Sequence, residues 1–497
     1  MPIILSKTDY IIFRECPKNA WMKIHKPEIY FQSELSEFEK HIIETGNEVE
    51  LAARKLFPTG ILVEGRGADA QKITQDYIQN KKSVLFQPVF LKEGFLAAVD
   101  ILKFNKDTDS YSIYEVKASN EIDEKTHFYD LAFQVNLLRK AGLKVIGINL
   151  IHLNSEYIRS GDLDITKLFK IDNVSEEINK ICDEVSLEME KALTYLSNNS
   201  EPSGHCGCIY KGRSKHCSTF KHSNPQVPEY SVHDIARIGS SPKKLAELID
   251  SGIFHIKDVP EHIKFSDIQK NQIDAHIYEK VLIKENKIAE EFENLTFPLY
   301  FLDYETFPCA IPRFDGFTPY QQIPFQYSLH ILESPESELK HFEFLYSDVG
   351  DPSKSLIESL QSHIGDVGSI IVWSKKFECR INKELAERIP DASSFIESLN
   401  SRVYDLMDIF SKQHYVHKDF KGSASIKKVL PIIASELSYK NLNIKEGGAA
   451  AQSWNKIVSA GFDKMEKENI IQDLKKYCEL DTYAMFAIWK NLRNLVE

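Results

Sequence analysis

The chain has 497 residues, too many for one hydrophobic core of ordinary size, so we expect two or three domains. Its composition, 42% hydrophobic and 27% charged, is that of a globular protein, and it contains no apolar run of about 18 residues that would indicate a transmembrane helix. The net charge of −12 argues against a protein that coats nucleic acid through bulk positive charge, but it is compatible with a nuclease whose acids hold metal ions.

The beginning of the chain predicts its location. Met1-Pro-Ile-Ile-Leu-Ser-Lys7 lacks the basic and then apolar layout of a signal peptide, so we expect a cytoplasmic protein. Eight cysteines in such a chain do not indicate disulfides. The cysteines are therefore candidates for packed thiols or metal ligands.

The N-terminal part, residues 1–222, mixes helix and strand patterns. A predicted hairpin joins two strands through the turn at residues 105–110. The predicted strands are 95–103, 111–117 and 145–153, and the predicted helices are 7–25, 37–56, 124–141 and 173–197.

Charged residues on this hairpin predict a first metal site. Asp100 lies in the first strand, and Glu115 and Lys117 lie two residues apart in the second, so they share a face. Two acids bind a divalent metal, and a lysine positions or activates the attacking water. Apolar neighbours make the site partly dry, which strengthens its charges. The alternative is an ordinary hairpin with exposed charges.

These residues resemble the core motif of the PD-(D/E)XK nuclease superfamily, in its RecB-like branch. The resemblance implies a restriction-endonuclease-like fold and a role for Gln134 on the helix after the motif. Leu138 stands where that branch often has a tyrosine. The resemblance also implies a further metal-site residue on an earlier helix, for which Glu50 or Glu48 is available.

Four cysteines flank this predicted nuclease core: Cys16 before it, and Cys206, Cys208 and Cys217 after it. Four thiolates suit a tetrahedral zinc ion or an iron–sulfur cluster, and His205 or His216 could replace a ligand in a zinc site. The split arrangement resembles the iron–sulfur nucleases of the AddB and CRISPR-adaptation type. It implies a 4Fe–4S cluster that joins the two ends of the domain, although the C-x-C-x8-C spacing is not the usual one.

A helical segment follows. Residues 223–228 have the Pro-containing composition of a linker, and residues 229–290 show only helical periodicity and short turns. Residues 235–252 fit a helix-hairpin-helix-like element or a plain helical connector. We therefore predict a connector over residues 223–295.

Residues 296–497 predict a second α/β domain. The predicted strands are 298–303, 325–332, 341–346 and 369–374, and the predicted helices are 352–364, 378–388 and 466–494.

Two motifs in this domain predict a second metal site. Asp303 and Glu305 lie two apart on a predicted strand and face the same side, and Tyr477 and Asp481 lie four apart on one face of a predicted helix. Acids that converge from a strand and a distant helix are what a two-metal phosphodiester hydrolase needs. Asp405, at the end of a strand-like run, is a further candidate ligand.

These motifs resemble the DEDD exonuclease superfamily with an RNase H-like fold, in the subgroup that has a tyrosine. The resemblance implies that Tyr477 orients the water nucleophile and that cleavage proceeds from a 3′ end. Its second motif places a further acid at Glu378, where the family normally has aspartate. Ser425 and Lys427, in a polar loop, are candidate phosphate contacts.

The whole architecture resembles an uncharacterised bacterial family that fuses a RecB-like nuclease to an RNase H-like exonuclease domain. We expect a bifunctional DNA nuclease that uses Mg²⁺ or Mn²⁺ at both sites, in repair, recombination or defence against foreign DNA. The alternatives are an RNA-processing exonuclease and an end-binding scaffold with an inert site. The sequence identifies no partner helicase and predicts no membrane association.

Overall fold

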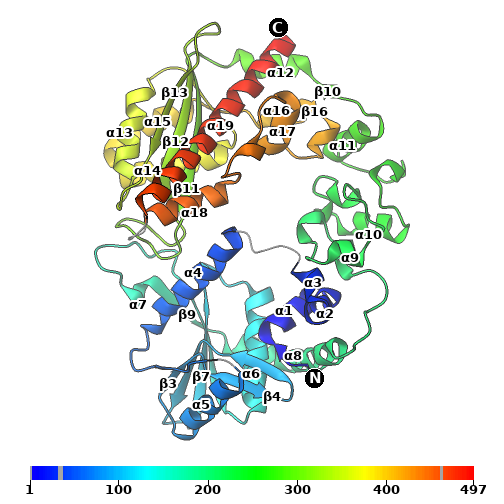
Figure 1. Ribbon diagram of the computed structural model, residues 1–497, viewed down its shortest axis with the longest axis vertical. Helices are drawn as coiled ribbons and strands as arrows, with labels where there is room; N and C mark the ends of the chain where they lie inside the picture. Colours follow the sequence, from blue (N-terminus) through cyan, green and yellow to red (C-terminus); the bar gives the residue numbers. More distant parts are fainter. Residues whose placement is uncertain (1–2, 32–36, 66, 459–462) are drawn as a thin grey trace. The chain divides into compact units, whose positions relative to one another are not determined.

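The computed structural model describes residues 3–31, 37–65, 67–458 and 463–497. By their contacts these residues form two compact units, Met1–Gln226 with Ala310–Gln321 and Val227–Cys309 with Gln322–Glu497. The chain is therefore a mixed α/β, multidomain protein with several sheets (Figure 1). Most of the predicted connector, residues 223–295, belongs to the second unit. No helix in the described part of the chain is long and apolar enough to cross a membrane.

The described residues of the first unit form two sheets. A three-stranded sheet has the order β1-β5-β4, with β1 at Leu5–Ser6, β4 at Val89–Lys92 and β5 at Phe95–Ala98. A six-stranded sheet has the order β2-β3-β6-β7-β8-β9, with these bounds: β2 Ile61–Leu62, β3 Val84–Phe86, β6 Ile101–Asn105, β7 Ser110–Lys117, β8 Val145–Leu153 and β9 Phe169–Asn173.

The prediction of a single strand over residues 95–103 was wrong. It is interrupted at Val99 and Asp100, so that β5 and β6 belong to different sheets. The Asp100 carboxylate accepts a hydrogen bond from the backbone N–H of Val116, at 2.8 Å, which holds the break against β7. The predicted hairpin is confirmed, because β6 and β7 pair antiparallel from Ile101 with Tyr114 to Asn105 with Ser110.

Helices cover both faces of the six-stranded sheet. The predicted helix 7–25 is two helices, because Pro17 lacks a backbone N–H and disfavours helical geometry at the residue before it. The helices are α1 Lys7–Glu15, α2 Pro17–His25, α3 Pro27–Tyr30, α4 Glu37–Arg54, α5 Gly67–Gln79, α6 Tyr129–Lys140 (preceded by a π-turn at Glu124–Phe128), α7 Ile165–Leu168, α8 Ser175–Leu196 and α9 Phe220–Ser223. One core packs α1, α6 and α8 on the sheet, and a second packs α4 on its other face.

The second unit begins with short helices: α10 Pro242–Asp250, α11 Asp267–Ile277 and α12 Glu285–Glu293, separated by 3-10 turns. Residues 235–252 contain one α-helix after a 3-10 turn at Ile238–Ser240, rather than the two helices of a helix-hairpin-helix element. The short strand β10, Leu282–Ile283, pairs with β16, Tyr415–Val416.

A five-stranded sheet of order β13-β12-β11-β14-β15 forms the centre of this unit. Its strands are β11 Leu299–Pro308, β12 Gln322–Leu332, β13 Lys340–Leu345, β14 Ser369–Val372 and β15 Val403–Asp405. β11, β12 and β13 pair antiparallel, whereas β14 and β15 run parallel to β11.

The two faces of this sheet carry different helices. The face of Tyr300, Leu302 and Tyr304 packs against α13 Ser353–His363, α14 Lys375–Arg388 and α15 Ser393–Ser401. The opposite face includes Phe301, whose ring contacts Phe486 and Trp489 of α19, Lys464–Val496. The remaining helices are α16 Asp408–Ser411, α17 Ile426–Ile433 and α18 Gly447–Ile457. Since strand residues alternate, Asp303 and Glu305 share the face that α19 covers.

Candidate functional site

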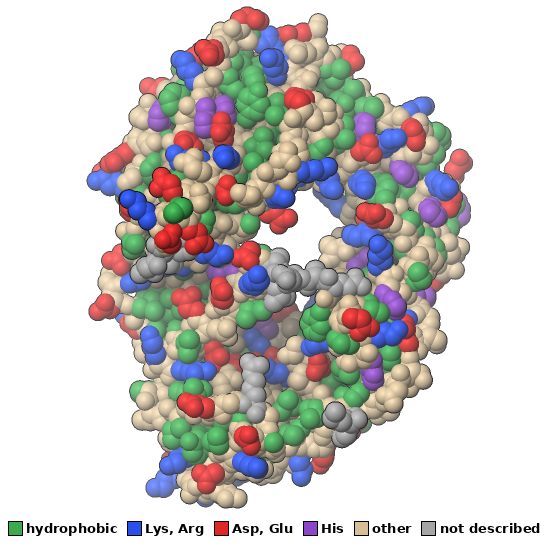
Figure 2. Space-filling view, viewed as in Figure 1, with side chains coloured by type: hydrophobic (Ala, Val, Ile, Leu, Met, Phe, Trp, Pro, Cys, Tyr) green, Lys and Arg blue, Asp and Glu red, His purple; other side chains and the backbone are tan. Residues whose placement is uncertain are grey.

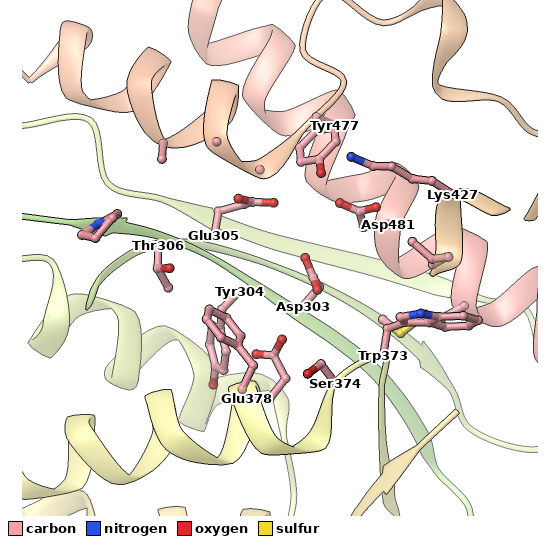
Figure 3. A pocket seen from close by; sticks show the side chains of 17 residues that line it. Asp303, Tyr304, Glu305, Thr306, Trp373, Ser374, Glu378, Lys427, Tyr477 and Asp481 are labelled. Atoms are coloured by element: carbon pink, nitrogen blue, oxygen red, sulfur yellow. The ribbon is translucent and has the colours of Figure 1, made fainter. Parts of the chain in front are cut away.

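A pocket of about 420 Å³ lies in the second unit between β11, α14 and α19. Figure 3 shows Asp303 and Glu305 reaching into it from the strand, while Tyr477 and Asp481 reach into it from the helix. The sequence placed these four residues about 170 positions apart in two motifs, and the fold brings both motifs to one cavity.

Three carboxylates of this pocket are close enough to share metal ions. One oxygen from each of Asp303, Glu305 and Asp481 lies within 4.8 Å of the others. Glu305 and Asp481 are buried, and Asp303 is half-buried. Hard carboxylate oxygens in such an arrangement suit Mg²⁺ or Mn²⁺.

Burial and mutual repulsion raise the pKa values of these three acids above their usual range. Burial, and then the charge of Asp481, raise the pKa of Asp303 well above its usual range. Burial and the charge of Asp303 do the same to the pKa of Glu305. Burial raises the pKa of Asp481 to about 6, against the opposing effect of its hydroxyl partners and of Lys427. A bound cation would relieve this repulsion.

Two tyrosines and a lysine lie around Asp481, and of these Tyr477 and Lys427 line the pocket. The Tyr439 hydroxyl donates to Asp481 Oδ1 at 2.5 Å, and Tyr477 lines the pocket beside Asp481. The Lys427 ammonium lies 5.8 Å from the centres of both tyrosine rings. Tyr439 was not found from the sequence, because its contact with Asp481 arises only in the folded chain.

Glu378, the acid implied by the second motif, also lines the pocket, from α14. It is 3% exposed, and its Oε2 atom has no hydrogen-bond partner among the described residues. Burial, followed by the charges of Asp303 and Glu305, raises the pKa of Glu378 well above its ordinary value. An orphaned buried carboxylate oxygen beside two further acids fits a ligand that approaches a metal ion.

Asp405 and Ser425 lie outside the residues that line this pocket. Asp405 accepts backbone N–H bonds from Lys375 at 2.8 Å and from Met407 at 3.1 Å, so it fixes the turn that starts α14. Ser425 precedes α17 as its N-cap residue, whereas Lys427, in the first turn of α17 rather than in a loop, does reach the pocket.

In the first unit, Glu115 is the centre of a buried charge network. It is 2% exposed, and its Oε1 accepts bonds from Lys7 at 2.8 Å and from Lys117 at 2.9 Å. Its Oε2 accepts from the Gln134 amide at 2.8 Å. The two lysines overcome burial and hold the pKa of Glu115 well below its usual range. Asp130 of α6 belongs to the same network, because Lys117 Nζ donates to its Oδ2 at 2.5 Å.

Asp100 and Glu50 lie beside this network and are linked through the Gln87 side chain. The Gln87 amide donates to Glu50 at 2.7 Å and to Asp100 at 3.1 Å, so it links α4 to the β5–β6 break. Glu50 also pairs with Arg54 at 2.7 Å, while Glu48 is exposed. Burial, and then the charge of Glu115, raise the pKa of Asp100 to about 7.

The fold therefore brings the predicted residues Asp100, Glu115, Lys117 and Gln134 together. It adds Lys7 and Asp130, which the sequence analysis did not predict. Lys7 was missed because it lies 108 residues from its partner Glu115. Asp130 was missed although it stands four residues before Gln134 on one helix face, a signal that the sequence carries. Among the described residues, three groups place metal-ligand atoms within 4.8 Å of one another, and these N-terminal acids are not one of them.

The four predicted cysteines form one of those groups. Cys16 lies between α1 and α2, and the other three lie after α8. The Sγ atoms of Cys206 and Cys217 are 3.9 Å apart, and the Asn224 amide donates to Cys206 Sγ at 3.3 Å. Contact with the Cys16 thiol lowers the pKa of Cys208 to about 7. Within the described chain neither His205 nor His216 joins the group, and a ring nitrogen of His216 bonds the Lys211 carbonyl.

Comparisons with known proteins give relatives without a stated activity. Residues 300–425, which include the β11 acids, match a family model described as a domain of unknown function, DUF2779. Uncharacterized protein UU173 of Ureaplasma parvum is 29% identical over 271 residues, 49% of this chain and 39% of that protein. Uncharacterized protein MG366 homolog of Mycoplasma pneumoniae is 28% identical over 221 residues, 41% of this chain and 33% of that protein. The chain therefore spans well under half the length of these relatives.

Proposed function

We propose that the chain is a metal-dependent nuclease with two sites, and that the second unit is an RNase H-like 3′–5′ exonuclease of the DEDD type with a tyrosine. The observation that carries the proposal is the convergence of Asp303, Glu305 and Asp481 in one pocket with Tyr477. A coincidental cluster of buried acids would be costly to maintain, because each raises the pKa of its neighbours.

The residues of this pocket fit Mg²⁺ or Mn²⁺, since four buried or half-buried acids face one cavity and Glu378 keeps an unbonded oxygen. Bound ions would supply an activated water and stabilise the leaving oxygen. Asp303, Glu305, Glu378 and Asp481 would hold the ions. The Tyr477 hydroxyl would orient the water, and Lys427 would attract the phosphate.

We assign the first unit to the PD-(D/E)XK nucleases, with Asp100 and Glu115 as metal ligands and Lys117 beside the attacking water. Glu50 and Gln134 support these ligands through the hydrogen bonds at Gln87 and Glu115. Both oxygens of Glu115 are already bonded, Oε1 by two lysines. Among the described residues Oε2 accepts only the Gln134 amide and keeps a lone pair for an ion, whereas on Oε1 Lys7 is a group that competes with the ion.

The four cysteines would hold a structural metal centre that joins the two ends of the first unit. Four Zn–S bonds of about 2.3 Å in a tetrahedron place sulfur atoms about 3.8 Å apart, close to the 3.9 Å between Cys206 and Cys217. A 4Fe–4S cluster would require wider spacing, because the cluster atoms lie between the cysteines. The resemblance favours iron–sulfur and the observed spacing favours zinc. Metal analysis and the visible spectrum of anaerobically purified protein distinguish them.

We propose DNA as the substrate, with RNA as the alternative. Figure 2 shows lysine and arginine side chains interspersed with acids on the face drawn, and the net charge is −12. Such a surface suits local phosphate contacts at a strand end rather than a long electrostatic coat. Degradation of matched DNA and RNA oligonucleotides separates the two substrates, and tight end binding without cleavage would favour the scaffold role.

Replacing Lys117 by methionine should abolish the products of the first site and leave those of the second. Methionine keeps the unbranched apolar stem of the side chain but removes the charge that contacts Glu115 and Asp130. We expect a loss of about 100-fold or more, the usual scale for a group that acts on the attacking water. The measurement is the rate of product formation on end-labelled DNA with Mn²⁺.

Lys103→Met is the matched control, since Lys103 is an exposed lysine on the neighbouring strand β6. Its activity should equal that of the wild type. Equal rates for Lys117→Met and the wild type would remove the first unit from the proposal.

Without metal, the protein should lose stability as the pH rises from about 4 to about 8, the range that spans the unfolded and folded pKa values of its buried acids. A carboxyl whose folded pKa is raised contributes stability below its unfolded pKa, and that contribution is lost as the pH rises through the folded value. That value is about 6 for Asp481 and about 7 for Asp100. The Asp481 shift alone corresponds to at most about 3 kcal/mol.

Thermal unfolding at both pH values, with EDTA and with Mn²⁺, measures this loss. We expect Mn²⁺ to reduce the fall in midpoint, because the ion neutralises the ionised acids. The same fall with and without Mn²⁺ would mean that the acids do not bind the ion.

A further inference from the structure

A third group of metal-ligand atoms lies outside both proposed nuclease sites. His330 of β12 and His341 of β13 are directly paired across the sheet, and Glu479 of α19 lies beside them. A ring nitrogen of each histidine and a carboxylate oxygen of Glu479 lie within 4.8 Å of one another. The imidazole rings are stacked, with their centres 4.5 Å apart. Neither histidine was singled out by the sequence patterns.

A chain of hydroxyl groups holds one nitrogen of each ring. His330 Nδ1 lies 2.8 Å from Thr482 Oγ1, and His341 Nε2 lies 3.0 Å from Ser328 Oγ. The two hydroxyls are 2.7 Å apart, and Thr482 Oγ1 also donates to the backbone carbonyl of Glu479 at 3.2 Å.

Each hydroxyl has a single proton, so the bond from Thr482 to the Glu479 carbonyl selects one direction for this chain. Since Thr482 donates to the Glu479 carbonyl, it accepts from Ser328 and from His330 Nδ1–H. Ser328, having donated to Thr482, accepts from His341 Nε2–H. In this direction of the chain, the protonated nitrogens are His330 Nδ1 and His341 Nε2.

This assignment leaves lone pairs on His330 Nε2 and His341 Nδ1. His341 Nδ1 is the nitrogen that faces the Glu479 carboxylate, 3.8 Å from Oε1. His330 is 3% exposed, so its ring is held inside the sheet packing beside Thr482. Metal-binding histidines have this arrangement, in which the second ring nitrogen is fixed by a hydrogen bond and the first is free to coordinate.

We propose that His330, His341 and Glu479 form a binding site for a divalent ion of the zinc type. Two imidazoles and a carboxylate are a common ligand set for zinc, and a water molecule completes four-coordination. The exposed Glu479 gives the ion access from solvent. The site does not depend on the proposed nuclease activity.

An ion bound by His330, His341 and Glu479 would cross-link α19 to the sheet beside the proposed nuclease pocket. Glu479 lies between Tyr477 and Asp481 on the same helix, so an ion held by β12, β13 and Glu479 restrains the segment that presents both pocket residues. The ion would act as a positioning device and would touch no substrate.

Zinc content per chain tests the site directly. Full-length wild type, His341→Gln and Glu479→Gln are loaded with Zn²⁺ and dialysed against metal-free buffer, and bound zinc is measured by mass spectrometry. We expect both variants to hold about one zinc ion fewer than the wild type, because the cysteine and acidic groups are unchanged. The rise in unfolding midpoint on adding Zn²⁺ should also shrink in both.

His262→Gln, at an exposed histidine of the region before α11, is the control and should match the wild type. Glu479→Gln alters a side chain that is 51% exposed, so its effect is separable from misfolding of the sheet. Equal zinc content and equal zinc-induced stabilisation in all four proteins would overturn the proposal.

Discussion

Replacing Asp303 by asparagine should reduce exonucleolytic release of nucleotides by about 1,000-fold or more. Partners that only orient a metal ligand already contribute about 10- to 100-fold, and Asp303 would be a ligand itself. Its carboxylate is one of the three whose oxygens lie within 4.8 Å of one another, so the neutral amide removes a charge from the centre of the pocket. The measurement is the rate of appearance of short products from 3′-extended, 5′-labelled strands.

Asp303→Asn should raise the stability of the metal-free protein, although it lowers the nuclease activity. Removing one buried acid relieves Glu305 and Asp481 of a like charge, so the variant should unfold at a higher temperature in EDTA than the wild type. Asp391→Asn, at an exposed aspartate of the same unit, should change neither property. Loss of activity together with loss of stability would indicate a damaged fold rather than a missing ligand.

Replacing Cys206 by alanine should lower the unfolding midpoint of the first unit by about 10 °C, since a cross-link between distant segments is worth about 3–5 kcal/mol. Cys16 and Cys206 lie about 190 residues apart, so the metal centre closes most of this unit into one loop. The variant should also lose the metal that wild type retains on dialysis. Differential scanning calorimetry and metal analysis measure the two effects.

Cys182→Ala is the matched control, because Cys182 is a buried cysteine of the same unit that lies outside the four-cysteine group. It should retain the metal and unfold with a smaller shift, from the lost packing of one sulfur. If Cys182→Ala and Cys206→Ala behave alike, the four cysteines are packed thiols and hold no centre.

The parts of the sites that depend on local spacing could be predicted from the sequence. Asp303 and Glu305 share a strand face, and Tyr477 and Asp481 share a helix face, and both relations follow from the periods of the two structures. The spacing of Asp130 and Gln134 carries the same kind of signal, although it was not used.

Contacts that depend on distant segments could not be predicted. Lys7 reaches Glu115, and Tyr439 reaches Asp481, only because the helices pack on the sheets, and no local pattern marks either residue. The break at Asp100 was hidden because the apolar pattern runs on through residues that belong to two sheets. The segment Ala310–Gln321, which joins β11 to β12, is grouped with the first unit by contacts that composition does not reveal.

The most direct test of the central claim is digestion of end-labelled single- and double-stranded DNA and RNA with Mn²⁺ or EDTA, comparing the wild type, Lys117→Met and Asp303→Asn. Two nucleases on one chain predict cleavage that needs Mn²⁺, with each variant losing a different set of products. A wild type that cleaves none of the substrates, or variants with unchanged products, would contradict the assignment and leave a binding role as the better account.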